Sequence, residues 1–366
     1  VAREPRSIEP HTALGDFYVA KGDPVRAEGE YTAAADLAPM GSPARIKLID
    51  FYLFVRKPEE AKRLLAEITG KLPDYLPAWR RLGEIAFAEG KYDESVKAVD
   101  VILKKRPADL DAHLLRGRVH LARRETTDAI DEFRKVLKLE PRLTRARYQL
   151  ALAQLQGGNL QSARGELREA ATIDPTFMEA TLLLAELDIQ AGALQPAIEA
   201  LERLVAKQPN EVRAYLLLGA AHLAKREAVK GTEAYRRVAA LVPKDPRGPY
   251  FVGLGLRAQG KSAEARSQFE AALGLAPEYV EPLAQLIAMA LREKKPDVAL
   301  DRVKQQITRA PKSAALHHLL GGVHRSRGEM ERAEAAYRKA LELNPNLSGT
   351  YVALAQLYVA SGKFPD

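Results

Sequence analysis

Residues 314–347, AALHHLLGGVHRSRGEMERAEAAYRKALELNPNL, form one unit of a pattern that repeats along the whole chain. Prolines mark the repeat, because they recur at constant intervals of 34 residues at Pro5, Pro39, Pro73, Pro107, Pro141, Pro175, Pro209, Pro243, Pro277, Pro311 and Pro345. A period of this length fits two helices of about 14 residues joined by two short turns. Proline cannot continue a helix, so each of these prolines ends one unit and starts the connection to the next.

The register of the repeat follows when this proline is placed at position 32 of each unit. Complete units then start at residues 8, 42, 76, 110, 144, 178, 212, 246, 280 and 314, with the end of a preceding unit at 1–7 and a partial unit at 348–366. We therefore predict an all-α fold in which residues 1–366 form a single array of ten complete repeats plus a partial repeat at each end. Neither end resembles a polar cap, and we expect the chain to be a slice of a longer array.

Small residues recur at two other places in the unit. Position 20 is small in all ten complete units, as at Ala129, and position 8 is Gly or Ala in most, as at Gly117. Position 24 is usually bulky and apolar, as at Phe133. We expect small side chains at positions 8 and 20 to let the two antiparallel helices of a unit approach closely. Ile49 and Ile287 depart from this rule at position 8.

This pattern resembles the tetratricopeptide repeat, and the resemblance covers essentially the whole chain. Two units carry it most clearly, through Trp79, Leu82, Gly83, Ser95 and Pro107 in one and Leu320, Gly321, Ala333, Tyr337, Ala340 and Pro345 in the other. The resemblance implies a right-handed α-α superhelix, a tetratricopeptide (TPR) solenoid that binds proteins. It also implies that positions 2, 5, 9 and 12 of each first helix line the concave groove.

Residues 175–201 are similar to long bacterial TPR lipoproteins that belong to exopolysaccharide export and PEP-CTERM protein-sorting systems. The similarity favours a bacterial protein, and the lack of cysteine fits the periplasm and the cytoplasm equally well.

Composition limits the chemistry that the chain can perform. It has no cysteine, so disulfides, thiolate metal sites and cysteine nucleophiles are excluded. The net charge of +8 is a mild excess over 366 residues and does not call for nucleic acid as a partner. No apolar run reaches the 18 residues that a membrane-spanning helix needs, so we expect no direct insertion into a membrane.

Candidate catalytic and cofactor motifs all have simpler interpretations. His113 and His120, like His317 and His324, occupy positions that aromatic residues fill in other units, and we saw no carboxylate recurring with them at ligand spacing. The G-x-G-x-x-A run at 253–258 falls inside a predicted helix rather than between a strand and a helix. We therefore expect no metal, no cofactor and no enzymatic activity.

The predicted groove combines acidic and apolar side chains. Asp16, Asp50 and Glu84 stand at position 9 of three successive units, and we expect them to attract a basic flank of the ligand. Apolar residues dominate the middle of the chain and predict contacts with an apolar partner segment, helical or extended. The full set of predicted partner-binding residues is Asp16, Asp50, Glu84, Leu114, Arg118, Tyr148, Leu152, Leu155, Leu182, Glu186, Leu216, Tyr250, Leu254 and Arg257.

The sequence thus predicts a non-catalytic scaffold within a bacterial multiprotein assembly, whose partner is a protein or peptide segment. Two alternatives stay open at this point. The chain could be the targeting arm of a larger enzyme such as a glycosyltransferase. It could instead be a structural spacer or a self-assembling scaffold, in which incomplete repeats at the ends associate with other copies.

Overall fold

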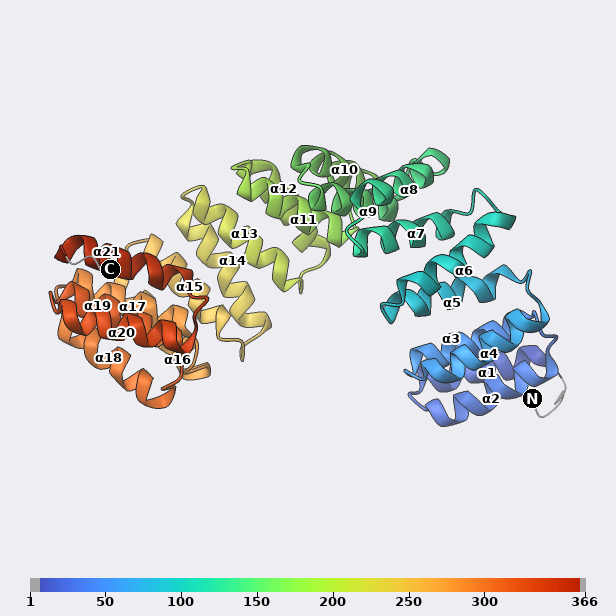
Figure 1. The fold of residues 1–366 in the computed structure, drawn as a ribbon, viewed down its shortest axis with the longest axis horizontal. Helices are drawn as coiled ribbons and strands as arrows, with labels where there is room; N and C mark the ends of the chain where they lie inside the picture. The colour runs from blue at the N-terminus through green and yellow to red at the C-terminus, as the bar shows by residue number, and fades with distance from the viewer. Residues whose placement is uncertain (1–6, 363–366) are drawn as a thin grey trace. The chain divides into compact units, whose positions relative to one another are not determined.

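The computed structural model describes residues 7–362, which form twenty-one α-helices and no strand within that range (Figure 1). The first helices of the pairs are α1 (Ile8–Ala20), α3 (Pro43–Phe54), α5 (Leu76–Ala88), α7 (Leu110–Ala122), α9 (Thr144–Gln156), α11 (Met178–Gln190), α13 (Val212–Ala224), α15 (Arg247–Ala258), α17 (Val280–Arg292), α19 (Ala314–Ser326) and α21 (Ser348–Ser361). The second helices are α2 (Pro24–Leu37), α4 (Pro58–Lys71), α6 (Tyr92–Lys105), α8 (Thr126–Leu139), α10 (Leu160–Ile173), α12 (Leu194–Lys207), α14 (Ala228–Leu241), α16 (Ser262–Leu275), α18 (Pro296–Arg309) and α20 (Met330–Leu343). The prediction of an all-α repeat fold is confirmed.

The first helices begin at the starting residues of the sequence repeat, or one residue later at Pro43 and Arg247. The chain divides into two compact units, residues 1–180 and 181–366, with the boundary inside α11. The organisation of the whole chain as one array stays a prediction, and the partial repeat predicted at 1–7 lies almost wholly outside the described residues. No helix within 7–362 is long and apolar enough to cross a bilayer.

The turn between the two helices of each repeat depends on one left-handed residue at position 15. Seven repeats place glycine there, with φ between 65° and 78° at Gly22, Gly90, Gly158, Gly192, Gly260, Gly328 and Gly362. The other four use Arg56, Arg124, Arg226 and Lys294, with φ between 58° and 66°. A side chain in this conformation is strained by roughly 1–2 kcal/mol, so the geometry of the turn is required even where glycine is absent.

Contact between the two helices of a repeat is closest at position 8. A Cβ atom added to Gly117 would lie 2.6 Å from the ring of Phe133, which stands at position 24 and is fully buried. Glycine and an aromatic ring meet in the same way in four further repeats, at Gly15 with Tyr31, Gly219 with Tyr235, Gly253 with Phe269 and Gly321 with Tyr337. The ring therefore occupies the space that a larger residue at position 8 would need.

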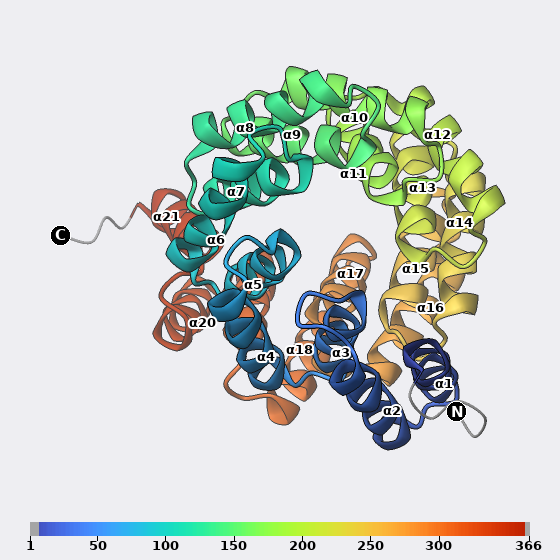
Figure 2. The same ribbon diagram turned by 90° about the vertical axis from the view of Figure 1, so that its right-hand side faces the viewer.

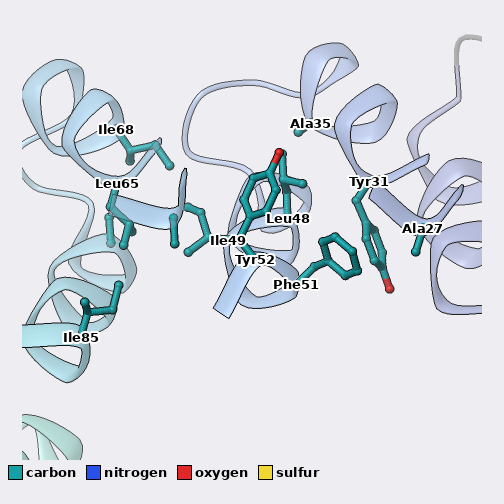
Figure 3. Packing of buried hydrophobic residues seen from close by; sticks show 12 residues of the cluster. Ala27, Tyr31, Ala35, Leu48, Ile49, Phe51, Tyr52, Leu65, Ile68 and Ile85 are labelled. Atoms are coloured by element: carbon teal, nitrogen blue, oxygen red, sulfur yellow. The ribbon is translucent and has the colours of Figure 1, made fainter. Parts of the chain in front are cut away.

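The two isoleucines at position 8 are accommodated by a smaller partner. Ile49 packs in one core cluster with Leu65, and Ile287 packs in another with Val303, at the position where five other repeats have an aromatic ring. Figure 3 shows this core in the N-terminal repeats, with Ile49 pointing toward Leu65 and the Tyr31 ring beside Phe51. The ring centroids of Tyr31 and Phe51 are 5.1 Å apart. The exchange of size between positions 8 and 24 keeps the shared volume filled.

Gly117→Ala tests this packing directly. We expect it to lower the free energy of unfolding by about 1–3 kcal/mol, because the new methyl group would overlap the buried Phe133 ring. Gly165→Ala is the matched control, since Gly165 lies in α10 with no described atom near its missing Cβ. The control should raise the unfolding free energy by up to about 1 kcal/mol through helix propensity. Urea denaturation of the two variants measures both effects, and equal changes would contradict the contact.

Candidate partner-binding face

The first helices of each unit lie on its concave side. In the first unit α5 contacts α7 and α7 contacts α9, and in the second α17 contacts α19 and α19 contacts α21. Second helices make no contacts of that extent with one another in the described part of the chain. Figure 2 shows α7 inside α8 in the first unit, and α13 inside α14 in the second. A surface on which neighbouring helices converge is the concave one, and it is the surface that positions 2, 5, 9 and 12 are expected to line.

Several apolar residues of this face remain partly accessible in the first unit. Tyr148, Leu152 and Leu155 lie on α9 and are half-buried. The Tyr148 ring makes an edge contact with Phe177, at a centroid distance of 5.6 Å. This part of the face is therefore apolar and ordered while still reaching solvent.

Two predicted groove residues prove to be part of the core. Leu114 is only 7% exposed, because it packs in a cluster with Ala129, Phe133 and Leu150, and Leu182 is 3% exposed. The prediction that these two leucines are available to a partner is wrong. Position 5 lies at the edge of the helix interface, so the local packing decides whether a side chain there is covered.

The second unit carries an aromatic cluster on its concave side. Leu216, Tyr250 and Leu254 are half-buried and pack against the core that contains Tyr235 and Phe269. Tyr250 also meets Tyr279 in a T-shaped contact, with centroids 5.3 Å apart. Arg257, further along α15, is half-buried and donates a hydrogen bond to the side-chain oxygen of Gln285.

The acidic residues at position 9 are paired within the chain. Lys47 Nζ lies 2.6 Å from Asp16 Oδ2, and Arg81 Nε lies 2.6 Å from Asp50 Oδ1. Both cations stand at position 6 of the following repeat, 31 residues after the acid. Burial raises the pKa of Asp16, but hydrogen bonds from Lys47 and Tyr31 outweigh it, so that the pKa falls below its usual range.

Glu84 and Glu186 have partners as well. Arg81 Nη1 lies 3.0 Å from Glu84 Oε2, and Arg213 Nη2 lies 2.7 Å from Glu186 Oε2. The predicted row of acids therefore presents little uncompensated negative charge to a basic ligand.

Side chains at position 4 fasten several first helices to the connection before them. Trp79 Nε1 donates to the carbonyl oxygen of Pro73 at 2.7 Å, and His113 Nε2 lies 2.8 Å from the carbonyl oxygen of Pro107. His113 Nδ1 is also 2.6 Å from Glu132 Oε2, inside the core. These contacts explain why ring residues with an N–H recur at this position, and they give the histidines a structural role.

The histidines at position 11 have carboxylate partners that our sequence analysis missed. Three pairs bring Nδ1 within 2.6–2.7 Å of the glutamate five residues later: His120 with Glu125, His222 with Glu227, and His324 with Glu329. The recurring glutamate at position 16 was the signal that could have revealed them. Around His120, the side chain of Asp128 joins the pair, with all three ligand atoms within 4.8 Å of one another. Both acids there reach solvent and no buried ligand among the described residues completes the set, so the grouping does not by itself make a metal site.

The glycine-rich run at 253–258 lies inside α15. Gly253 packs on the Phe269 ring, and a Cβ atom at Gly255 would overlap the hydroxyl of Thr232. The backbone N–H groups of a helix interior are used in the helix itself, so this run cannot cradle a phosphate.

Comparison with known proteins agrees with this architecture. Models of the tetratricopeptide repeat match residues 56–119 and 154–221, residues 114–176, and residues 314–347. No curated protein matches the chain in sequence.

One similar solved structure shows the same kind of fold, and two others match with lower scores. A tetratricopeptide repeat protein from Parabacteroides merdae is 16% identical over 68% of this chain and 98% of its own, with a TM-score of 0.52. MamA from Desulfovibrio magneticus is 20% identical over 46% of this chain and 96% of its own, with a TM-score of 0.43. YrrB, described as a TPR protein with an unusual peptide-binding site, is 14% identical over 51% of this chain and 97% of its own, with a TM-score of 0.46.

The position 11 pairs predict a dependence of stability on pH. Hydrogen bonds from Arg327 and then His324 lower the pKa of Glu329 from 4.5 to about 2. Because the folded pKa lies below the unfolded one, this stabilisation is complete above about pH 4.5 and is lost as the pH falls toward 2. Glu329→Gln should lower the free energy of unfolding at pH 7 and flatten its decline over that window.

Urea titrations at a series of pH values measure this effect. Glu233→Gln is the control, since Glu233 is an exposed residue of α14 that forms no ion pair with any described residue. If both variants follow the same pH curve, the Glu329 contacts do not stabilise the fold.

Proposed function

Because the chain belongs to the tetratricopeptide repeat family, we propose that it is a non-catalytic scaffold whose concave first-helix face binds a segment of a partner protein. Solenoids of stacked repeats offer extended concave surfaces of this kind. The observation that carries the proposal is the half-buried apolar row on α9, formed by Tyr148, Leu152 and Leu155. The similarity of residues 175–201 to bacterial lipoproteins favours a multiprotein assembly as the setting.

An ordered, partly exposed apolar row is suited to binding a peptide. Burying an exposed leucine side chain completely contributes roughly 1.5–3 kcal/mol to binding. A leucine that is already half-buried can still gain part of that free energy when a partner covers it. Its surroundings already fix its conformation, so little entropy is lost when a partner covers it. The second unit carries an apolar set of its own, Leu216, Tyr250 and Leu254, with Glu186 and Arg257 as polar neighbours.

Peptide selection tests the proposal without a known partner. We expect a phage-displayed library of random peptides to yield binders of the full chain, and Leu152→Ala to weaken them roughly tenfold through lost burial. Leu160→Ala makes the same chemical change on the second helix α10, where Leu160 is 41% exposed. This control should leave binding unchanged, as measured by fluorescence anisotropy. Equal losses in the two variants, with unchanged melting temperatures, would refute binding on the concave face.

A second candidate function is self-association through α21. Tyr351, Val352 and Val359 on this helix are 52%, 57% and 69% exposed. Ala355, at position 8, is exposed too, whereas Leu357 packs into the core. In the other repeats position 8 is covered by the second helix, and no second helix follows α21 within the described residues. A second copy of the chain could cover this face, in a contact between different surfaces that need not close into a ring.

Sedimentation velocity over a range of concentrations tests self-association. The wild-type chain should show a sedimentation coefficient that rises with concentration, and Val352→Lys combined with Val359→Lys should remove that rise. Val229→Lys is the control, because Val229 is an isolated exposed residue of α14 at 59%. A wild-type chain that stays monomeric at every concentration would exclude this candidate.

A further inference from the structure

The repeat geometry brings position 9 of one first helix close to position 2 of the next. In the second unit these positions hold Glu186 and Arg213, 27 residues apart, and the two side chains form an ion pair at 2.7 Å. Successive repeats stack in the same register, so any two residues with this relationship face each other across the concave surface.

In the first unit the same two positions hold Arg118 on α7 and Arg145 on α9. Two positive charges thus stand where the second unit has an acid and a base. Neither guanidinium forms an ion pair or a hydrogen bond to any described residue. Arg118 is half-buried and lies over the Phe87 ring, with its Cζ atom 4.3 Å from the ring centroid, while Arg145 is exposed.

The surrounding charges do not fully compensate this pair. Burial lowers the pKa of Arg118 and the charge of Arg145 lowers it further, whereas Glu84 raises it. Glu84 is hydrogen-bonded to Arg81 and is therefore shared between two arginines. Asp111, at position 2 of α7, pairs with Arg80. The pair therefore lacks an anion of its own among the described residues.

We propose that Arg118 and Arg145 together bind the carboxylate of an aspartate or glutamate in the partner segment, an inference that rests on the proposed function. Guanidinium groups match the planar carboxylate and donate two parallel hydrogen bonds to it. Tyr148 and Leu152 lie three and seven residues beyond Arg145 on the same face of α9. The partner segment thus carries an acidic residue beside apolar ones. This differs from the sequence-based expectation, in which the acids at position 9 were to attract a basic flank of the ligand.

Phage selection on the full chain supplies the probe peptides, and their composition is the first result. We expect enrichment in Asp and Glu next to apolar residues. Arg118→Glu recreates the opposite-charge pair of the second unit and should fold, because the introduced carboxylate could pair with Arg145. It should weaken the selected peptides roughly ten- to a hundredfold. Arg145→Ala should act in the same direction, as should replacing the acidic residue of each peptide by Gln or Asn.

Arg142→Ala is the matched control. Arg142 is exposed, forms no ion pair with any described residue and stands three residues before Arg145, so removing it changes the net charge equally. Its binding should equal that of the wild type. If Arg142→Ala weakens the peptides as much as Arg145→Ala, they respond only to net charge, and the site is refuted.

Two further outcomes separate this inference from the function on which it rests. Selected peptides without acidic residues, still weakened by Leu152→Ala, would leave the scaffold function standing and overturn the carboxylate site. A library that yields no binder at all would count against both.

Discussion

The structure depends on the contact between position 8 of each first helix and position 24 of each second helix. Sizes at the two positions are reciprocal in most repeats: glycine meets an aromatic ring in five repeats, whereas isoleucine meets Leu65 or Val303 in two others. Gly83 is an exception, since position 24 of its repeat is Val99 and Leu115 of the next repeat lies beside it instead. Two more repeats combine a buried alanine at position 8, Ala151 or Ala185, with a buried leucine at position 24, Leu167 or Leu201. Because interiors are close-packed, this exchange of volume keeps the two helices of a repeat at a similar separation despite different side chains.

Because the two helices of each repeat keep a similar separation, successive repeats stack in the same register. Ion pairs on the surface therefore join the same positions in different repeats. The pairs Asp16–Lys47 and Asp50–Arg81 both join position 9 to position 6 of the next repeat. The Glu186–Arg213 pair joins position 9 to position 2. Arg118 and Arg145 occupy the same two positions as Glu186 and Arg213, but both of them carry a positive charge. No described residue supplies an anion for these two guanidinium groups, and the proposed carboxylate of the partner would fill that place.

The sequence predicts the repeat fold and its helices well, because proline, glycine and small residues act locally. It could not predict which side chains are covered. Leu114 and Tyr148 both stand at position 5, yet Leu114 is buried beside Phe133 while Tyr148 remains half-exposed. The pairing of Asp16 and Asp50 with cations 31 residues away also required the stacking geometry. The glutamates that bind His120, His222 and His324 were visible in the sequence, since they recur at a fixed spacing, and were overlooked.

A crystal structure of the chain with a peptide selected on it tests the central claim most directly, namely that the concave first-helix face holds the partner. The account predicts that the peptide lies along the first helices of the first unit, with its carboxylate between the guanidinium groups of Arg118 and Arg145 and an apolar neighbour on Leu152. A peptide bound along the second helices, with the concave face empty, would contradict it.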